Sequence, residues 1–407
     1  MKYILIIGDG MGDEPIAALG GKTPLEATST PVMDRLAREG EQMLVRTVPE
    51  GYPPGSDVAN LSLLGYEPEK YYTGRAPLEA ASMGVDLADD ELAFRCNLVT
   101  VEQLDGRMVM RDYSAGHITT AESTALIQAV QDYCGTERLR LYPGISYRHL
   151  LVLQGEPLEL KTVPPHDYLD QDVTDFYAKY LQVDYLKTLM ENAAAVLADH
   201  PVNKERIKQG KNPANSLWLW GEGRSPAMKP LSERFGITGA LISAVDLLKG
   251  IGVYAGLQVP EIEGATGYID TNYAGKVEAA LAALSTGDIV IVHLEGPDEA
   301  GHQGSLADKV QAIEDLDSKI VAPIVTSLEE SGEPFRMVVC MDHYTPLSIR
   351  THVDWPVPVL LYDSRGVACP GGRSYSEANA GIAAEESGLP PVSGALFFDR
   401  FIRGEQR

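Results

Sequence analysis

Three short stretches near the C-terminal end of the chain carry the residue types of a metal site. The stretches are Asp298-Glu299-Ala300-Gly301-His302, Met341-Asp342-His343 and Thr351-His352. Their two aspartates and three histidines suit borderline divalent ions such as zinc and manganese, and they exceed what one ion normally takes from a protein. The pattern therefore predicts two metal ions, with Asp9 near the N-terminus as a distant further ligand.

A serine in the N-terminal part of the chain has the setting of a nucleophile. Ser56 follows the turn Pro53-Pro54-Gly55 and starts an apolar-periodic segment, so we expect it at a helix N-terminus. There, free backbone N–H groups and the helix dipole favour an alkoxide or an attached phosphate, and an adjacent metal can deprotonate the hydroxyl. An ordinary N-cap serine fits the same pattern, so Ser56 taken alone leaves both interpretations open.

The composition is that of a soluble globular chain with a strongly acidic balance. Its 407 residues, 44% of them hydrophobic, can bury a large core and are enough for two domains. No apolar run approaches the ~20 residues that span a bilayer, and Tyr3 to Ile7 is too short for a signal peptide. A formal charge of -24 repels nucleic acid and anionic membranes, so neither is expected as a partner.

The cysteines indicate a reducing compartment. Cys96, Cys134, Cys340 and Cys369 are widely spaced and form no Cys-x-x-Cys pair, so neither a disulfide framework nor a zinc knuckle is predicted. We therefore expect a cytoplasmic protein. The oligomeric state is left open, a homo-oligomer included.

Short continuous apolar runs predict strands that are buried on both faces of a parallel sheet. These runs are Tyr3 to Ile7, Ile289 to Val292, Met337 to Cys340 and Val357 to Leu361. Helical patterns lie between them, at Pro31 to Gly40 and at Asp308 to Leu328. The alternation predicts an α/β protein in which helices are layered on a mostly parallel sheet.

The candidate ligands directly follow these strands. Asp9 comes after the first strand, Asp298 just after the second, and Asp342-His343 after the third. Ligands of open parallel sheets bind beyond the carboxyl ends of the strands. We therefore expect these side chains to meet at one edge of the sheet, although Asp9 is far from the others in sequence.

The middle of the chain differs from the rest in its sequence pattern. Aromatic and proline-punctuated segments such as Tyr142 to His149 and Thr162 to Tyr168 alternate with short strand-like runs and a helix around Tyr185 to Leu197. Because the candidate metal ligands lie in sequence on both sides of this region, the simplest account is a second, α+β domain inserted into the first. The expected domains are a discontinuous metal-binding core, 1–77 with 214–407, and an inserted substrate-binding domain, 78–213.

Taken together, these motifs resemble those of a known enzyme family. The motifs Gly8-Asp9-Gly10-Met11-Gly12-Asp13, Pro54-Gly55-Ser56-Asp57, Asp298 to His302, and Asp342-His343 followed by His352 are similar, in this order, to the archaeal-type cofactor-independent phosphoglycerate mutases. This family lies within the alkaline phosphatase superfamily. The likeness extends over nearly the whole chain and implies an alkaline-phosphatase-like layered α/β sandwich with an inserted domain.

The resemblance also implies a metal-bound serine that is transiently phosphorylated. One metal would be held by Asp298, His302 and His352, and the other by Asp9, Asp342, His343 and the hydroxyl of Ser56. Two metals suit an in-line phosphoryl transfer, because one activates the nucleophile and both neutralise charge on the phosphate. The ligand types leave the identity of the ions open among Mn, Zn and Mg.

The chain departs from the mutase pattern where anionic groups of the substrate would bind. Typical members carry Asp-Arg-Arg-Ala-Gly-Arg in the inserted domain, whereas this chain has Asp112-Tyr113-Ser114-Ala115-Gly116-His117. The family's lysine before the Asp298 motif is replaced here by Glu295. Arginine forks bind phosphate and carboxylate with paired hydrogen bonds, so their loss indicates a less anionic substrate that carries an ammonium group.

These departures resemble a subgroup of the family proposed to act as homoserine kinases. We therefore expect transfer of phosphate from ATP through Ser56 to homoserine, a small-molecule substrate, in threonine biosynthesis. Glu295 or Asp112 would pair with the ammonium group and Arg148 or Arg206 with the carboxylate. His117 is a further candidate contact. For the two arginines, a surface salt bridge fits the sequence as well.

Two alternatives stay open. A glycolytic phosphoglycerate mutase would take its arginines from other positions, such as Arg75, Arg95, Arg111 or Arg140. A phosphatase or phosphodiesterase would use water as the acceptor. Both would use the same metal ligands and the same serine, so the substrate is what separates them from the kinase.

Overall fold

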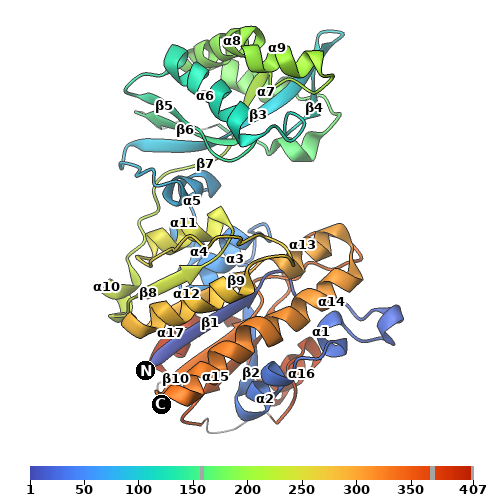
Figure 1. The fold of residues 1–407 in the computed structure, drawn as a ribbon, viewed down its shortest axis with the longest axis vertical. Helices are drawn as coiled ribbons and strands as arrows, with labels where there is room; N and C mark the ends of the chain where they lie inside the picture. Colours follow the sequence, from blue (N-terminus) through green and yellow to red (C-terminus); the bar gives the residue numbers. More distant parts are fainter. Residues whose placement is uncertain (156–159, 367–371, 405–407) are drawn as a thin grey trace. The chain divides into compact units, whose positions relative to one another are not determined.

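The apolar N-terminal segment forms β1 (Lys2–Gly8), which lies inside the larger of two sheets (Figure 1). The computed structural model describes residues 1–155, 160–366 and 372–404. Within them the larger sheet has seven strands in the order β12-β2-β11-β10-β1-β9-β8. The strands beside β1 are β2 (Glu41–Arg46), β8 (Gly239–Ile242), β9 (Ile289–Leu294), β10 (Phe335–Cys340), β11 (Val357–Asp363) and β12 (Val392–Ser393).

Most of this sheet is parallel. β9 and β10 flank β1 and run parallel to it, and β8 continues the parallel order beyond β9. β11 instead runs antiparallel to both β10 and β2, so the expectation of a parallel strand over Val357 to Leu361 was wrong. A parallel neighbour needs a crossover, usually a helix, and the segment from Met341 to Pro356 contains none. The chain therefore turns back directly from the edge where β10 ends.

Helices cover both faces of this sheet. Every residue of its strand β9 is buried as a result. One group comprises α2 (Pro31–Glu39), α12 (Tyr273–Thr286), α14 (Leu306–Asp315) and α15 (Ala322–Ser331), and its members meet at the π-helical turn Leu316–Val321. A second group comprises α3 (Ser56–Leu63), α11 (Asp246–Tyr254) and α17 (Gly394–Arg403). The remaining helices here are α1 (Pro24–Ala27), α4 (Pro68–Tyr71), α10 (Leu231–Phe235), α13 (Gly296–Gln303) and α16 (Glu377–Ser387).

The second sheet is antiparallel and is organised around one long strand, β3 (Glu91–Leu104). Its partners are β4 (Arg107–Asp112), β6 (Arg148–Gln154) and β7 (Ser216–Gly223), while β5 (Leu139–Tyr142) pairs with β6. One face of β3 packs with α6 (Thr120–Cys134) and α8 (Asp184–Asp199), and the other face packs against α5 (Arg75–Ser82). The smaller helices are α7 (Thr174–Leu181) and α9 (Pro201–Lys208).

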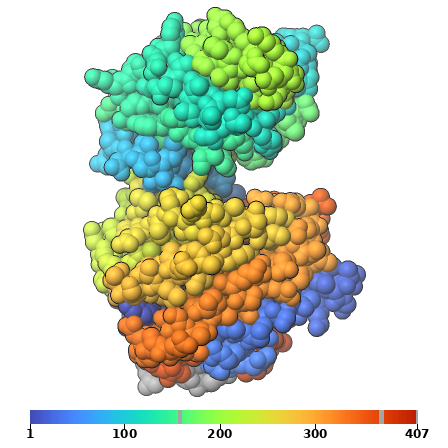
Figure 2. All heavy atoms as spheres, viewed as in Figure 1, coloured from blue at the N-terminus to red at the C-terminus, as the bar shows by residue number. Residues whose placement is uncertain are grey.

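Contacts along the chain divide the protein into two units. Unit 1 comprises Met1–Tyr72 and Ala227–Arg407, and unit 2 comprises Thr73–Pro226. The boundaries expected after residues 77 and 213 fall inside unit 2, because both α5 and β7 pack on β3. On the surface of unit 1, Figure 2 shows the blue N-terminal and orange C-terminal segments side by side. Unit 1 is thus built from both ends of the chain.

The expected fold class is confirmed. Unit 1 is a layered α/β sandwich around a mostly parallel sheet, and unit 2 is an α+β body with an antiparallel sheet. Among the described residues, no helix has the length and apolarity needed to cross a bilayer. Cys96, Cys134 and Cys340 are free thiols, and Cys369 lies outside the described residues.

Asn203 is expected to stabilise unit 2 through three buried hydrogen bonds. Its Nδ2 donates to the carbonyls of Leu197 and Ala214 at 2.8 Å each, and its Oδ1 accepts from the Ala214 N–H at 2.9 Å. Asn203→Ala leaves these buried groups unpaired and should lower the free energy of unfolding by about 3 kcal/mol. Urea unfolding followed by tryptophan fluorescence measures the change, since Trp218 and Trp220 lie in this unit.

Asn192→Ala on α8 is the matched control. The structure records no side-chain hydrogen bond of Asn192 with the described residues, so the substitution should change stability by less than about 1 kcal/mol. Equal effects of the two substitutions would contradict the role given to Asn203.

Candidate metal centre and nucleophile

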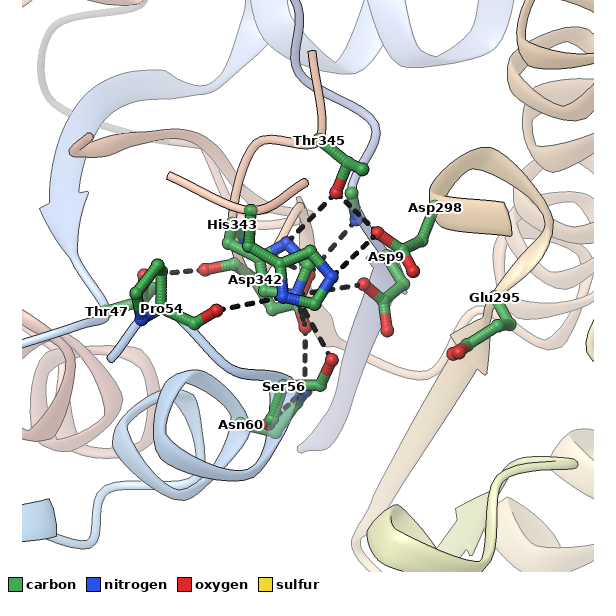
Figure 3. A network of polar contacts seen from close by, with 12 residues as sticks. Asp9, Thr47, Pro54, Ser56, Asn60, Glu295, Asp298, Asp342, His343 and Thr345 are labelled. Atoms are coloured by element: carbon green, nitrogen blue, oxygen red, sulfur yellow. Dashed lines mark hydrogen bonds and ion pairs between the residues drawn. The ribbon is translucent and has the colours of Figure 1, made fainter. Parts of the chain in front are cut away.

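The carboxyl ends of β1 and β10 bring three fully buried side chains together, Asp9, Asp342 and His343 (Figure 3). Oδ1 of Asp342 accepts from the N–H groups of Gly10 (3.2 Å) and His343 (2.9 Å). Nε2 of His343 lies 3.4 Å from Oδ1 of Asp9 and 3.5 Å from Oδ2 of Asp342. Gly10 has a φ of +58°, and a Cβ there would lie 2.4 Å from Oδ1 of Asp298, so only glycine fits this turn.

Ser56 is the first residue of α3, as its position after Gly55 predicted. Its Oγ lies 3.1 Å from Nε2 of His343, and its side chain is almost fully buried. One turn later on α3, Asn60 donates from Nδ2 to the Ser56 carbonyl and to Oδ2 of Asp342, each at 2.8 Å. The structure therefore places the serine hydroxyl beside the Asp9, Asp342 and His343 cluster.

A second group of side chains surrounds Asp298 on α13. Nε2 of His302 lies 3.2 Å from Oδ2 of Asp298, and Nε2 of His352 lies 3.4 Å from its Oδ1. The two Nε2 atoms are only 2.9 Å apart. His343 adjoins this group, because its ring stacks on His352 at a centroid distance of 3.9 Å.

The orientation of these two imidazoles fits a cation. Nδ1 of His302 faces the carbonyl of Arg350 at 3.0 Å, and Nδ1 of His352 faces the carbonyl of Pro54 at 2.8 Å. A carbonyl accepts only from a protonated nitrogen, so in the neutral rings both Nε2 atoms carry lone pairs that point at each other and at Asp298. Backbone carbonyls orient metal-binding histidines in this way. A divalent ion among these atoms would turn repulsion into coordination.

Among the described residues, donor atoms gather in three groups that could hold a metal ion, one of them formed by Asp9, His293 and Glu295. The ligand atoms of Asp9, Asp342 and His343 lie within 4.8 Å of one another, and so do those of Asp298, His343 and His352. Oδ1 of Asp9 is buried without a hydrogen-bond partner, as expected of an atom that would coordinate a cation. All the metal ligands expected from the sequence are thus brought together by the fold.

The protonation of the centre reflects its burial. Burial raises the pKa of Asp9 well above its ordinary value, and it raises that of Glu295 to about 8, with neighbouring carboxylates adding to both. Burial alone would raise the pKa of Asp298, but hydrogen bonds with imidazoles bring it well below the ordinary value. The hydrogen bond with Asp298 in turn raises the pKa of His302 to about 9. Burial lowers the pKa of His343.

Three neighbours of the centre were not found from the sequence. Nε2 of His293 lies 2.8 Å from Oδ2 of Asp9, and its Nδ1 lies 3.2 Å from Oγ of Ser243, both within hydrogen-bond distance. Lys309 is fully buried and donates to Asp13 and to the carbonyls of Gly12 and Thr345. Asn60 links α3 to Asp342. Only His293 left a signal, as a polar residue at the end of an otherwise apolar strand.

Two of the residues expected to contact the substrate, Asp112 and Arg206, make hydrogen bonds within the protein. Asp112 accepts from Ser114 N, Ser114 Oγ, Gly116 N and Asn212 Nδ2, so it organises its own loop. Arg206 is buried and donates to Glu122 and to the carbonyls of Asn212 and Ala115. Both side chains are thus held by hydrogen bonds within unit 2.

The other residues expected to contact the substrate are His117, Arg148 and Glu295, and they do not all lie in the same unit. His117 and Arg148 are exposed in unit 2, where the His117 ring meets Tyr113 and Tyr147. Glu295 belongs to unit 1 and sits beside Asp9, with Oε2 3.6 Å from Nε2 of His293. Burial, with the charge of Asp298 added to it, raises the pKa of Glu295 to about 8.

Comparisons with known proteins give consistent names. A family profile described as 2,3-bisphosphoglycerate-independent phosphoglycerate mutase matches residues 37–203. The chain is 52% identical over 389 residues, 95% of this chain and 97% of the relative, to a probable mutase of this description from Geobacter sulfurreducens. It is 53% identical over 376 residues, 92% and 94% of the chains, to the mutase of Methanosarcina acetivorans. The solved cofactor-independent phosphoglycerate mutase from Thermoplasma acidophilum covers 99% of each chain at 28% identity, with a TM-score of 0.66.

The names of these relatives contradict the expectation that the protein is a homoserine kinase. Relatives that share about half of all residues over nine tenths of the chain are named mutases, so homoserine, threonine biosynthesis and ATP as the donor are not supported. The structure also gives other partners to the two acids behind that expectation. Asp112 accepts four hydrogen bonds within unit 2, and Glu295 faces the Asp9 carboxyl group.

Metal binding is expected to tighten as the pH rises. Without metal, Asp9 has a strongly raised pKa, Glu295 has a pKa of about 8 and His302 has a pKa of about 9. Protons on these groups compete with the cation, so the affinity for Mn²⁺ should increase from about pH 6 to about pH 9, with release of protons on binding. Isothermal titration in buffers of different ionisation enthalpy measures both quantities.

Glu295→Gln removes one of these titrations and should flatten the dependence below about pH 8. Glu278→Gln on the exposed side of α12 changes the charge equally and should leave the profile unaltered. An affinity for Mn²⁺ that is independent of pH would contradict the protonation described here.

Proposed function

This chain belongs to the family of 2,3-bisphosphoglycerate-independent phosphoglycerate mutases, and from that premise we propose that it interconverts the two monophosphoglycerates of glycolysis in the cytoplasm. The observation that supports the proposal best is Ser56, whose Oγ lies 3.1 Å from Nε2 of His343 at the start of α3. A serine phosphorylated at this place can return the phosphate to a different hydroxyl of the same glycerate. Such a reaction uses neither ATP nor a diffusible bisphosphate.

Two divalent ions complete the proposed site. One ion would be held by Asp298, His302 and His352, and the other by Asp9, Asp342, His343 and the Ser56 hydroxyl. When bound, such ions lower the pKa of a coordinated hydroxyl and neutralise charge on the transferred phosphate. The carboxylate and imidazole ligands suit manganese or zinc, and magnesium where carboxylates dominate.

Residues of the chain itself position the nucleophile. Gly55 is the N-cap of α3 and offers no side-chain cap, so backbone N–H groups and the helix dipole at this end favour a phosphate on Ser56. Asn60 ties the Ser56 carbonyl to Asp342, and Thr47 donates to the Asp342 carbonyl at 2.6 Å. These bonds hold the nucleophile and one proposed metal ligand in a fixed relation.

The proposed chemistry consists of two displacements. Oγ of Ser56 attacks the phosphorus, the bond from phosphorus to the glycerate oxygen breaks, and that oxygen takes up the equivalent of the proton lost by the serine. The neighbouring hydroxyl of glycerate then attacks the phosphoserine, and Ser56 regains a proton. Every atom balances without water, so the acceptor must stay bound between the two steps.

Ser56→Ala is expected to abolish the interconversion. The substitution removes the only atom that accepts the phosphate, so turnover should fall more than about 10³-fold. The bound metal should stay at two ions per chain, because the carboxylate and imidazole ligands are intact. Conversion of 3-phosphoglycerate without ATP, followed by ³¹P NMR, and elemental analysis of the purified protein measure the two quantities.

Ser62→Ala lies on the same helix and is the matched control, since Ser62 is a buried serine near the other end of α3. It should keep near-normal turnover. A Ser56→Ala protein with near-normal rates would rule out the phosphoserine route. An absolute need for ATP or for added 2,3-bisphosphoglycerate would rule out the proposed reaction.

A further inference from the structure

His343 belongs to two of the groups of donor atoms in unit 1, and a neutral imidazole can carry its proton on either nitrogen. Burial lowers the pKa of His343, so the ring is neutral in the metal-free protein. Its Nε2 faces Oγ of Ser56 at 3.1 Å and the carboxylates of Asp9 and Asp342. Only the tautomer with the proton on Nδ1 leaves Nε2 a lone pair for a cation. The group that sets this tautomer therefore decides whether His343 is ready to be a ligand.

The other ring nitrogen of His343 has one polar neighbour among the described residues, the hydroxyl of Thr345 (Figure 3). The distance from Nδ1 to Oγ1 is 3.3 Å, within hydrogen-bond distance. The same hydroxyl oxygen is in close contact with Oδ1 of Asp298. Although burial opposes it, hydrogen bonds with imidazoles hold the pKa of Asp298 well below its ordinary value. This carboxyl group is therefore ionised and can only accept a hydrogen bond.

The single proton of the Thr345 hydroxyl is taken by Asp298. Two oxygens in hydrogen-bond contact must share a hydrogen, and an ionised carboxylate has none to give, so Thr345 is the donor. Towards His343, Oγ1 can then act only as an acceptor, and the hydrogen bond between them needs a proton on Nδ1. Thr345 and Asp298 together thus favour the tautomer in which Nε2 directs its lone pair toward Ser56.

Thr345 is fully buried, and its surroundings restrict the rotation of its side chain. Its carbonyl accepts from Nζ of the buried Lys309 at 2.8 Å. A Cβ on Gly301 would lie 2.8 Å from Cγ2 of Thr345, and a Cβ on Gly10 would lie 2.5 Å from its Oγ1. The two glycines therefore leave just enough room for the methyl and hydroxyl groups. Since a β-branched side chain is also stiff about χ1, the hydroxyl is held between its two partners.

His343 differs from the other two histidines of the centre in the kind of acceptor that faces its Nδ1. His302 and His352 face the backbone carbonyls of Arg350 and Pro54. A carbonyl can only accept, whereas a hydroxyl accepts reliably only while its own proton is committed elsewhere. The acceptor of His343 is also a side chain, so a substitution can remove it without changing the backbone.

We propose that Thr345 is a positioning residue that holds His343 in the tautomer with the proton on Nδ1, an inference that rests on the proposed function. In this tautomer Nε2 is ready for the cation beside Ser56. Without the hydroxyl, Nδ1 has no acceptor among the described residues, and the carboxylates of Asp9 and Asp342 draw the ring proton to Nε2. A proton on Nε2 competes with the cation, so the ring must change tautomer before it can coordinate.

The tautomer can be observed directly in the metal-free, full-length protein. With ¹⁵N-labelled histidine, two-bond ¹H–¹⁵N correlation spectra distinguish a protonated from an unprotonated ring nitrogen, and the His343 signals are those that His343→Gln loses. We expect the proton on Nδ1 in the unsubstituted protein and in Thr345→Ser, and a shift toward Nε2 in Thr345→Val. A proton on Nε2 in the unsubstituted protein would overturn the inference, whether or not Thr345→Val folds.

Calorimetry with Mn²⁺ measures the consequence for metal binding. Thr345→Val should weaken the binding of one Mn²⁺ ion about 10- to 100-fold, the usual effect of losing a group that orients a metal-binding histidine. Thr345→Ser keeps the hydroxyl and should bind Mn²⁺ nearly as tightly as the unsubstituted protein. This rescue separates the hydrogen bond from the packing of the methyl group.

Thr100→Val is the matched control, because it removes a buried threonine hydroxyl that donates to the Pro213 carbonyl at 2.8 Å in unit 2. It should leave the His343 spectrum and Mn²⁺ binding unchanged. Equal losses of affinity in Thr345→Val and Thr100→Val, equal losses in Thr345→Val and Thr345→Ser, or no loss in Thr345→Val would each overturn the inference.

Failure of the proposed function has a different signature, because neither measurement uses phosphoglycerate. In that case the tautomer and the Mn²⁺ affinities follow the expectation for Thr345, while the unsubstituted protein does not interconvert phosphoglycerates.

Discussion

Negative charge buried at the carboxyl ends of the central strands is the constraint on which unit 1 depends. Asp9 and Asp342 are fully buried and Asp298 nearly so, and all three lie close to His343. Like charges at such distances in a low-dielectric interior are strongly unfavourable unless protons or cations lie among them. Burial, with the repulsion of neighbouring carboxylates added to it, raises the pKa of Asp9 well above its ordinary value in the metal-free protein. Bound divalent cations would also relieve this repulsion, and they would in addition support the proposed phosphoryl transfer.

Much of the surrounding structure serves to hold that arrangement. Thr345 donates to Asp298 and contacts His343, so it links the two groups of donors. Lys309 carries a positive charge into the interior and joins the loop after β1 to the loop after β10. Carbonyls of Arg350 and Pro54 orient two imidazoles. The donors are thus in place before any ligand arrives, which keeps the cost of reorganisation low.

The sequence was informative wherever chemistry coincided with a strand end. Asp9 and Asp342 could be placed because an apolar run predicts a buried strand, and the residue after a parallel strand lies at the ligand-binding edge. The direction of β11 could not be predicted, since an apolar run of that length reads the same in either orientation. The partners of Asp112 and Arg206 could not be predicted, because Asn212, which donates to Asp112, and Glu122, which pairs with Arg206, are distant from them in sequence. Asn60 and His293 act only through neighbours that the fold supplies.

The position of β1 also orders events during synthesis of the protein. Tyr3 of this first strand pairs with Ile289 on one side and with Arg336 on the other, so both partners leave the ribosome long after β1 does. All of unit 2 is made in the interval, and in the part of it that the structure describes the strands pair with one another. Non-local pairing of this kind is slow, and an unpaired apolar strand is prone to aggregate. Ile4 to Ile7 therefore lack these two partner strands for as long as the ribosome is making unit 2, and β1 is completed only after β9 and β10 have been made.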